Sequence, residues 1–222
     1  MRRGELSEGV TLKARRTSRI AALFLAACVG QGPQLALAAS PGSEHVHADL
    51  AADGVRTTVV DYAVPAVTLL RDDGRRVALA HELDDGRPVV LNFIYTTCPG
   101  ICPLMSAVFA DFQNRLGSER SRVHMVSISI DPEQDSPARL RAYAQKFSAG
   151  SQWQHYTGSV ASSIAVQKAF DAYRGDKMSH DPLTLMRLAP GKPWVRVDGF
   201  ATGPELMERY LQLAVLCEHR PA

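Results

Sequence analysis

Residues 89–105 read VVLNFIYTTCPGICPLM, an apolar run that leads directly into a loop carrying Cys98 and Cys102. The run is rich in β-branched residues and lacks polar alternation, which is typical of a central strand buried on both faces. Apolar side chains then recur at every fourth position, at Leu104, Val108, Phe112 and Leu116. This spacing predicts an amphipathic helix over 102–117. The cysteine pair is therefore expected between a buried strand and the helix that follows it.

Strand and helix patterns alternate on both sides of this segment. Two short apolar runs around Asp73-Gly74 predict an N-terminal β-hairpin. The remaining patterns predict a strand over 123–131, helices over 136–147 and 159–173, a second hairpin over 183–199, and a closing helix over 203–219. This order predicts an α/β fold with a central mixed β-sheet flanked by helices. A cysteine pair after a buried strand is similar to the arrangement in thioredoxin-like domains.

The N-terminal residues predict an export signal. A basic stretch ending at ARRTSR precedes the apolar run IAALFLAACV, which is too short to cross a bilayer comfortably but suits a signal peptide. The small residues at 36–38 match ordinary cleavage, whereas LAAC matches a lipobox that would make Cys28 a lipidated N-terminus. We expect an exported, periplasmic bacterial protein, either released or anchored to the inner membrane through Cys28 or an uncleaved segment.

Three parts of the chain are expected from these patterns. A signal peptide or lipoprotein leader covers 1–38, a flexible tether covers 39–60, and a thioredoxin-like domain covers 61–222. The leader carries six basic and two acidic side chains, so the formal net charge of +2 for the 222 residues leaves the remainder at −2. That remainder has no basic cluster, which argues against nucleic acid as a partner.

The spacing of Cys98 and Cys102 leaves three kinds of site open: a structural disulfide, a redox dithiol and a metal site. The free N–H groups and positive dipole end of the following helix favour thiolate over thiol, so both cysteines are expected to be more acidic than free cysteine. Zinc is disfavoured because a structural zinc site needs four ligands and there is no second cysteine pair. Two thiolates suit a soft ion, of which Cu(I) is the obvious case.

A metal site would need a third ligand, and His180 is the best candidate among the histidines. It lies in DKMSHDPLTLM, a polar loop that leads straight into a strand, so its side chain need not be packed. The other histidines have simpler explanations. His45 and His47 lie in the expected tether, and His81 is expected at the surface. His124 lies in a predicted strand, His155 is expected to pack against aromatic residues, and His219 lies in the C-terminal tail. Cys217 is expected to be a small buried residue of the last helix.

Four segments together resemble the Sco/SenC family: VVLNFIYTTCPGICPLM, VSISIDPEQDSPARLRAYAQKF, WQHYTGS and the lone histidine before the last hairpin. The resemblance covers roughly residues 60–215. It implies a thioredoxin-fold copper protein that helps to assemble the CuA centre of cytochrome c oxidase. By motif, it places the copper ligands at Cys98, Cys102 and His180. The family usually reads Asp-His-Ser around the histidine, whereas here the acidic neighbour, Asp181, follows the ring. Asp131, in the SIDP motif, is expected to shape a turn.

The resemblance implies a metallochaperone for copper, as Cu(I), Cu(II) or both, with the copper-containing oxidase subunit and other copper carriers or thiol-disulfide proteins as partners. Two alternatives remain open. In the first, the chain is a thiol-disulfide oxidoreductase in which Cys98 attacks and Cys102 resolves, so these two are also redox candidates. In the second, the chain is a copper or redox sensor. Whether the protein is an enzyme therefore stays open, although a chaperone is favoured.

Overall fold

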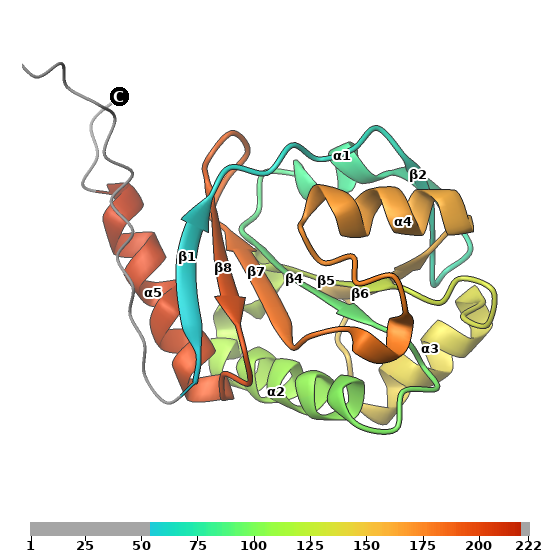
Figure 1. Ribbon diagram of the computed structural model, residues 1–222. Helices are drawn as coiled ribbons and strands as arrows, with labels where there is room; N and C mark the ends of the chain where they lie inside the picture. The colour runs from blue at the N-terminus through green and yellow to red at the C-terminus, as the bar shows by residue number, and fades with distance from the viewer. Residues whose placement is uncertain (1–53, 219–222) are drawn as a thin grey trace, which may run out of the picture. The chain divides into compact units, whose positions relative to one another are not determined.

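The computed structural model describes residues 54–218, with side chains up to residue 214 (Figure 1). These residues fall within one compact unit. The leader, Cys28, the histidine pair at 45 and 47 and His219 lie outside the described residues, as does the side chain of Cys217. No helix within 54–218 is both long and apolar enough to span a membrane.

A single mixed sheet forms the centre of the domain, with strands in the order β1-β8-β7-β4-β5-β6-β2-β3. The strands are β1 Arg56–Val60, β2 Thr68–Arg71, β3 Arg76–Ala78, β4 Val89–Ile94, β5 His124–Ser129, β6 Trp153–Thr157, β7 Leu183–Arg187 and β8 Trp194–Asp198. Strands β4, β5 and β6 run parallel, and the remaining neighbours pair antiparallel. The predicted α/β fold with a mixed sheet and both predicted hairpins is confirmed.

Helices cover both faces of the sheet. They are α1 Leu79–Leu83, α2 Ile101–Leu116, α3 Pro137–Lys146, α4 Val160–Ala169 and α5 Gly203–Glu218, with short 3-10 helices η1 Gly117–Arg122 and η2 Lys177–Ser179. Helices α1 and α4 lie on one face, and α2, α3 and α5 lie on the other (Figure 1). Every residue of β4 is buried, as expected for a strand covered on both sides.

Two strands differ from the sequence prediction. The expected tether over 39–60 ends in β1, whose residues pair antiparallel with β8, so the folded domain begins before residue 61. The segment WQHYT forms β6, parallel to β5, although no strand was predicted there. It was missed because it is short, and because its two aromatic residues with a histidine between them show no alternation of apolar and polar side chains.

The buried face of α2 is rotated from the predicted one. Leu104 is exposed, whereas Cys102, Met105 and Phe109 are buried along with Phe112 and Leu116. The spacing of apolar residues identified the helix but not which side of its first turn is buried. That turn faces the cysteine loop and α3 instead of the main core, so it buries Cys102 and leaves Leu104 outside.

Candidate metal centre

The register of two neighbouring strands brings distant loops to one edge of the sheet. Strand β4 pairs antiparallel with β7, with Asn92 opposite Thr184. The carboxyl end of β4 therefore lies beside the amino end of β7. The loop that follows β4 carries Cys98, and the loop that precedes β7 carries His180, so residues far apart in sequence meet at this edge.

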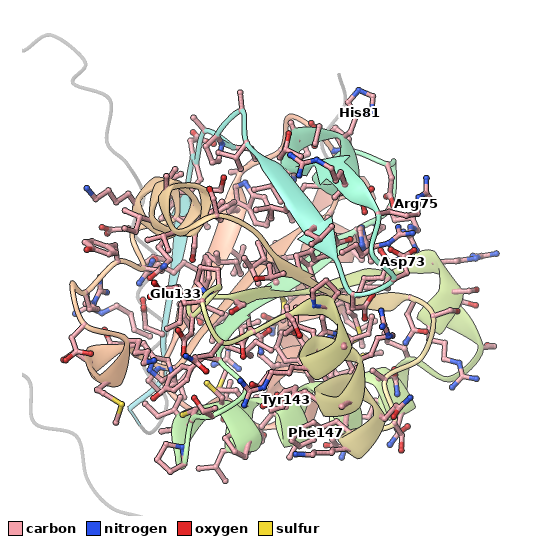
Figure 2. All side chains as sticks on the ribbon, turned by 90° about the vertical axis from the view of Figure 1, so that its right-hand side faces the viewer. Asp73, Arg75, His81, Glu133, Tyr143 and Phe147 are labelled. Carbon is pink, nitrogen blue, oxygen red and sulfur yellow. The ribbon has the colours of Figure 1, made fainter. Side chains whose placement is uncertain are left out.

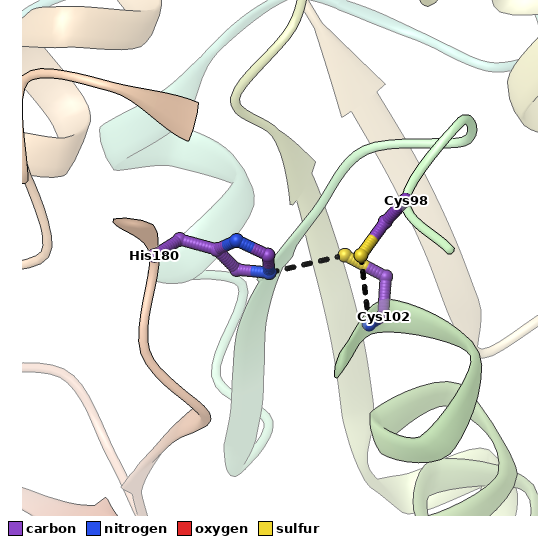
Figure 3. Close-up of side chains that lie close together, drawn as sticks. All are labelled: Cys98, Cys102 and His180. Atoms are coloured by element: carbon purple, nitrogen blue, oxygen red, sulfur yellow. Dashed lines mark hydrogen bonds between the residues drawn. The ribbon is translucent and has the colours of Figure 1, made fainter. Parts of the chain in front are cut away.

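The side chains of Cys98, Cys102 and His180 converge here (Figure 3). Their potential ligand atoms all lie within 4.8 Å of one another. The Nε2 atom of His180 is 3.3 Å from the Sγ atom of Cys102. Cys102 is fully buried, and Cys98 and His180 are each only 8% exposed. The three predicted ligand residues thus form a compact, nearly buried group of two sulfurs and one ring nitrogen.

The imidazole of His180 is oriented by its own local turn. Its Nδ1 atom is 2.7 Å from the carbonyl oxygen of Lys177. Because a carbonyl can only accept, Nδ1 carries the hydrogen and Nε2 presents its lone pair to the cysteines. The turn is η2, whose first residue is Lys177, and the side chain of Asp176 caps it by accepting from the N–H of Met178.

A salt bridge anchors this turn to the neighbouring loop. The Lys177 ammonium group lies 2.6 Å from Oδ2 of Asp131, which is nearly buried. The backbone carbonyl of Asp131 also accepts hydrogen bonds from the N–H groups of Gln134 and Asp135. Asp131 therefore shapes a turn, as its motif predicted, and in addition holds the residue whose carbonyl orients His180.

The amino end of α2 acts on Cys98. The Cys102 N–H points at the Cys98 sulfur at 3.4 Å. Burial alone would raise the pKa of the Cys98 thiol, but hydrogen bonds from the backbone N–H groups of Cys102 and Gly100 outweigh it, so this pKa is lowered. Cys98 is therefore the acidic thiol, as predicted for this position.

The expectation for Cys102 was wrong. Burial, reinforced by the nearby charges of Cys98 and Asp135, raises the pKa of the Cys102 thiol. The Tyr95 N–H at 3.3 Å favours the thiolate but does not compensate for burial. The helix dipole applies to both residues, but only Cys98 lies outside the first turn, where free N–H groups point toward it.

A buried carboxylate holds the cysteine loop in place. Asp135 is fully buried and accepts hydrogen bonds from the Thr96 N–H at 3.2 Å, the Thr96 hydroxyl at 2.5 Å and the Ser129 hydroxyl at 2.6 Å. It thus joins the ends of β4 and β5 just before the cysteines. Sequence reasoning missed Asp135, since its partners come from separate segments and no local pattern marks it.

Tyr95 forms one wall of the site. Its ring meets the His180 ring edge to face at 5.2 Å between centroids. Burial, together with a hydrogen bond to the Cys98 thiol, raises the pKa of the Tyr95 hydroxyl to about 12, so the phenol remains a donor. This residue was read only as part of the buried strand, although it is the first residue after it.

The other described histidines stay away from this group. His81 is exposed on α1 and points into solvent (Figure 2), as expected for a surface residue. His155 is fully buried and stacks on Trp153, which confirms aromatic packing. His124 was expected at the edge of the core or in solvent but is 1% exposed, with its Nε2 atom 3.0 Å from the Gln154 side-chain oxygen.

A surface pocket of about 360 Å³ borders the imidazole of His180. It lies between the loop after β5, helix α4 and the segment that leads to η2. Both acidic and basic side chains line it, among them Asp131, Glu133 and Lys177. The candidate site therefore adjoins a hollow into which a side chain of another molecule can reach.

The chain matches the family model described as SCO1/SenC over residues 61–187. It is 35% identical over 106 residues to the SCO1 protein homolog of Bacillus subtilis, covering 47% of this chain and 54% of that relative. The chain thus spans about half the length of this curated relative.

Two solved structures resemble the domain. A SCO1/SenC family lipoprotein from Bacillus anthracis has a TM-score of 0.61 and 24% identity, covering 70% of this chain and 97% of that one. Bradyrhizobium japonicum ScoI with copper bound has a TM-score of 0.58 and 24% identity, covering 68% and 99% respectively. At this identity they support the thioredoxin-like fold alone. Since the family model covers more than half of its residues, this chain belongs to the SCO1/SenC family.

Proposed function

We propose that this chain is a copper metallochaperone that helps to assemble the CuA centre of cytochrome c oxidase. In this proposal Cys98, Cys102 and His180 hold the copper ion that is delivered. The observation that carries it is the convergence of two sulfurs and an imidazole nitrogen within 4.8 Å. The similar ScoI structure contains copper, which agrees with this assignment.

The donor set suits copper better than the other common metals. Thiolates select soft ions such as Cu(I), and an imidazole nitrogen also binds copper well. The lowered pKa of the Cys98 thiol already favours its thiolate form. A bound cation would favour loss of the Cys102 proton, because the positive charge of the ion offsets the effect of burial on a ligating thiol. Binding should therefore release protons and depend on pH.

Three protein ligands at the edge of the domain suit a metal ion that is transferred to a partner protein. A structural site closes all positions with protein ligands, whereas a site with one side open can accept a ligand from a partner. We infer that the recipient is the copper-containing subunit of the oxidase, with other copper carriers or thiol-disulfide proteins upstream. The similar lipoprotein from Bacillus anthracis supports an exported, membrane-anchored setting, in which Cys28 would be the anchor.

Metal analysis combined with thiol counting tests this function. The reduced domain should bind one copper ion with Cys98 and Cys102 protected, and the oxidised domain should bind none. The change His180→Ala should weaken copper retention by at least about 100-fold, the upper range seen when even a supporting partner of a metal ligand is removed. Both thiols should still titrate.

The control variant is His81→Ala, because His81 is exposed on α1 and does not belong to the group of three converging side chains. It should bind copper like the unmodified chain. Unchanged copper affinity in His180→Ala would reject the three-ligand site and favour the dithiol alternative.

A second candidate function, thiol-disulfide exchange, is favoured by the contrast between the two cysteines. The Cys98 thiolate would attack a client disulfide, form a mixed disulfide and expel one client thiolate. Cys102 would then lose its proton and attack Cys98, which releases the second client thiol and leaves a Cys98–Cys102 disulfide. The client would gain the two electrons that the pair loses. The lowered pKa of Cys98 and the raised pKa of buried Cys102 fit these unequal roles.

The variant Cys102→Ser separates the two functions. As a reductase, it should accumulate a stable mixed disulfide with a peptide containing an oxidised pair of cysteines, and His180→Ala should still reduce that peptide. Absence of any mixed disulfide would reject the reductase. A sensor would instead bind its partner differently with and without copper and would keep its metal, which a pull-down followed by metal analysis would detect.

A further inference from the structure

One sulfur close to the candidate site belongs to neither cysteine. Met178 lies two residues before His180, in the short helix η2, which His180 follows directly. Its side chain is 61% exposed, which makes it one of the most exposed large apolar residues in the described part of the chain. Its backbone N–H is fixed by the cap from Asp176 at 2.9 Å. This capped backbone therefore holds an exposed thioether side chain two residues before the proposed ligand His180.

The thioether of Met178 contacts Tyr95, the residue that forms one wall of the site. The Tyr95 hydroxyl donates to the Sδ atom of Met178 at 3.1 Å. The same hydroxyl also takes part in a hydrogen bond with the Cys98 thiol. The same phenol therefore contacts Met178 and interacts with Cys98, and its ring packs against His180.

We propose that Met178 is a fourth, exchangeable ligand of the copper site, through its thioether sulfur. The inference rests on the proposed copper function and deepens it. A thioether is a soft donor of the type that selects Cu(I). It carries no proton to displace and adds no charge to a site that already contains two thiolates. It would thus complete the coordination without further cost of burying charge.

The mobility of the side chain suits an exchangeable role. Methionine has three rotatable side-chain bonds and adapts to irregular spaces. The Tyr95 hydroxyl has only one hydrogen, so it donates to either Met178 or Cys98 at a given moment. When it turns to Cys98, the thioether is released and can swing toward the ion. An exposed ligand of this kind would meet incoming copper first and would give way most easily to a ligand from a recipient.

Selenium labelling tests the assignment directly. The chain is prepared with selenomethionine, reduced, loaded with one equivalent of Cu(I) and measured by X-ray absorption at the copper edge. Three samples are compared: the unmodified chain, Met178→Leu and the control Met207→Leu. Met207 is partly buried in α5 and packs with the core on α2, remote from the cysteine loop. Leucine replaces methionine with little change in volume, so both variants should fold.

We expect a copper–selenium contact in the unmodified chain and in Met207→Leu, and its loss in Met178→Leu. We also expect Met178→Leu to lose Cu(I) to a competing chelator more readily, by roughly tenfold, the lower end of losses seen for supporting partners of metal sites. Thiol counts should stay the same in all three samples.

The possible results separate this inference from the proposed function. Copper bound by two sulfurs and one nitrogen, without selenium, in all three samples would overturn the role of Met178 and leave the copper function standing. A copper–selenium contact that persists in Met178→Leu would likewise overturn it, because another methionine would then be the ligand. Failure of the unmodified chain to bind Cu(I) at all would overturn both.

Discussion

The stability of the domain should fall in mild acid because of His155. This ring is fully buried, stacked on Trp153 at 5.3 Å between centroids and near Tyr143 of α3 at 6.4 Å. Neither ring nitrogen has a hydrogen-bond partner among the described residues. Burial lowers the pKa of His155 to about 3. The Asp72 carboxylate, 3.8 Å from Nδ1, is thus next to a neutral ring rather than an ion-pair partner at neutral pH.

The expected magnitude follows from the two pKa values. An unfolded histidine titrates near 6.5, so between about pH 6.5 and pH 3 the unfolded chain binds one proton that the folded chain does not. Because the folded pKa is the lower one, the free energy of unfolding is at its full value above the unfolded pKa and decreases as the pH falls. The slope is ~1.4 kcal/mol per pH unit, and the total loss between pH 6.5 and pH 4.5 is about 2 kcal/mol.

Urea unfolding of the unmodified chain and of His155→Phe at several pH values in this window measures the effect. Phenylalanine does not titrate and suits an aromatic environment. Its larger size can change the absolute stability, but not the dependence on pH. The variant should lose about 2 kcal/mol less than the unmodified chain over this range. The control substitution His81→Ala, at an exposed residue, should leave the pH dependence of the free energy of unfolding unchanged. Parallel pH curves for His155→Phe and the unmodified chain would refute the reasoning.

Three further predictions concern the site. A thiol reagent at neutral pH should modify Cys98 before Cys102, because the pKa of Cys98 is lowered, whereas Cys102 is fully buried and its pKa is raised. Peptide mapping after brief labelling gives the order of modification, and equal labelling of the two cysteines would contradict this prediction. Asp135→Asn should lower the free energy of unfolding by about 1–3 kcal/mol, because an amide cannot accept from all the donors that now meet this carboxylate; an unchanged thermal midpoint would count against this. Lys177→Gln should speed the loss of copper to a chelator at an unchanged thiol count, because the turn that carries His180 loses its anchor; an unaltered rate would exclude that role.

Much of the fold could be predicted because its strongest signals are local. The unbroken apolar run of β4, the Asp73-Gly74 turn and the Ser136 cap with Pro137 each identify an element from adjacent residues. The cap is observed, with the Ser136 hydroxyl accepting from the Arg139 N–H at 3.3 Å.

The errors occurred where tertiary packing overrides a local pattern. Strand β1 has only half-buried and exposed residues, and it is a strand because β8 offers an edge to pair with. Leu104 continues an apolar repeat yet faces outward, because the first turn of α2 packs its other side beneath the cysteine loop. Neither outcome can be read from adjacent residues.

The three side chains that converge could be predicted from the sequence, but the residues that hold them in place could not. Two cysteines in one loop are visible in the sequence, and the resemblance to a family selected His180. The contacts that hold them in place, Tyr95 with His180 and Asp131 with Lys177, join residues far apart in the sequence. For the same reason the difference in acidity between the cysteines was missed, since it depends on which sulfur the surrounding chain buries.

The antiparallel pairing of β4 with β7 fixes the distance between the starting points of the two loops that carry the candidate ligands. A slip of two residues in that ladder would move the imidazole by roughly 7 Å relative to the sulfurs and abolish the cluster. Insertions or deletions in segments that carry none of the residues of the site, by contrast, leave the ladder untouched. Such changes should therefore alter the surrounding surface, and with it the contacts with a partner, without changing the spacing of the three side chains.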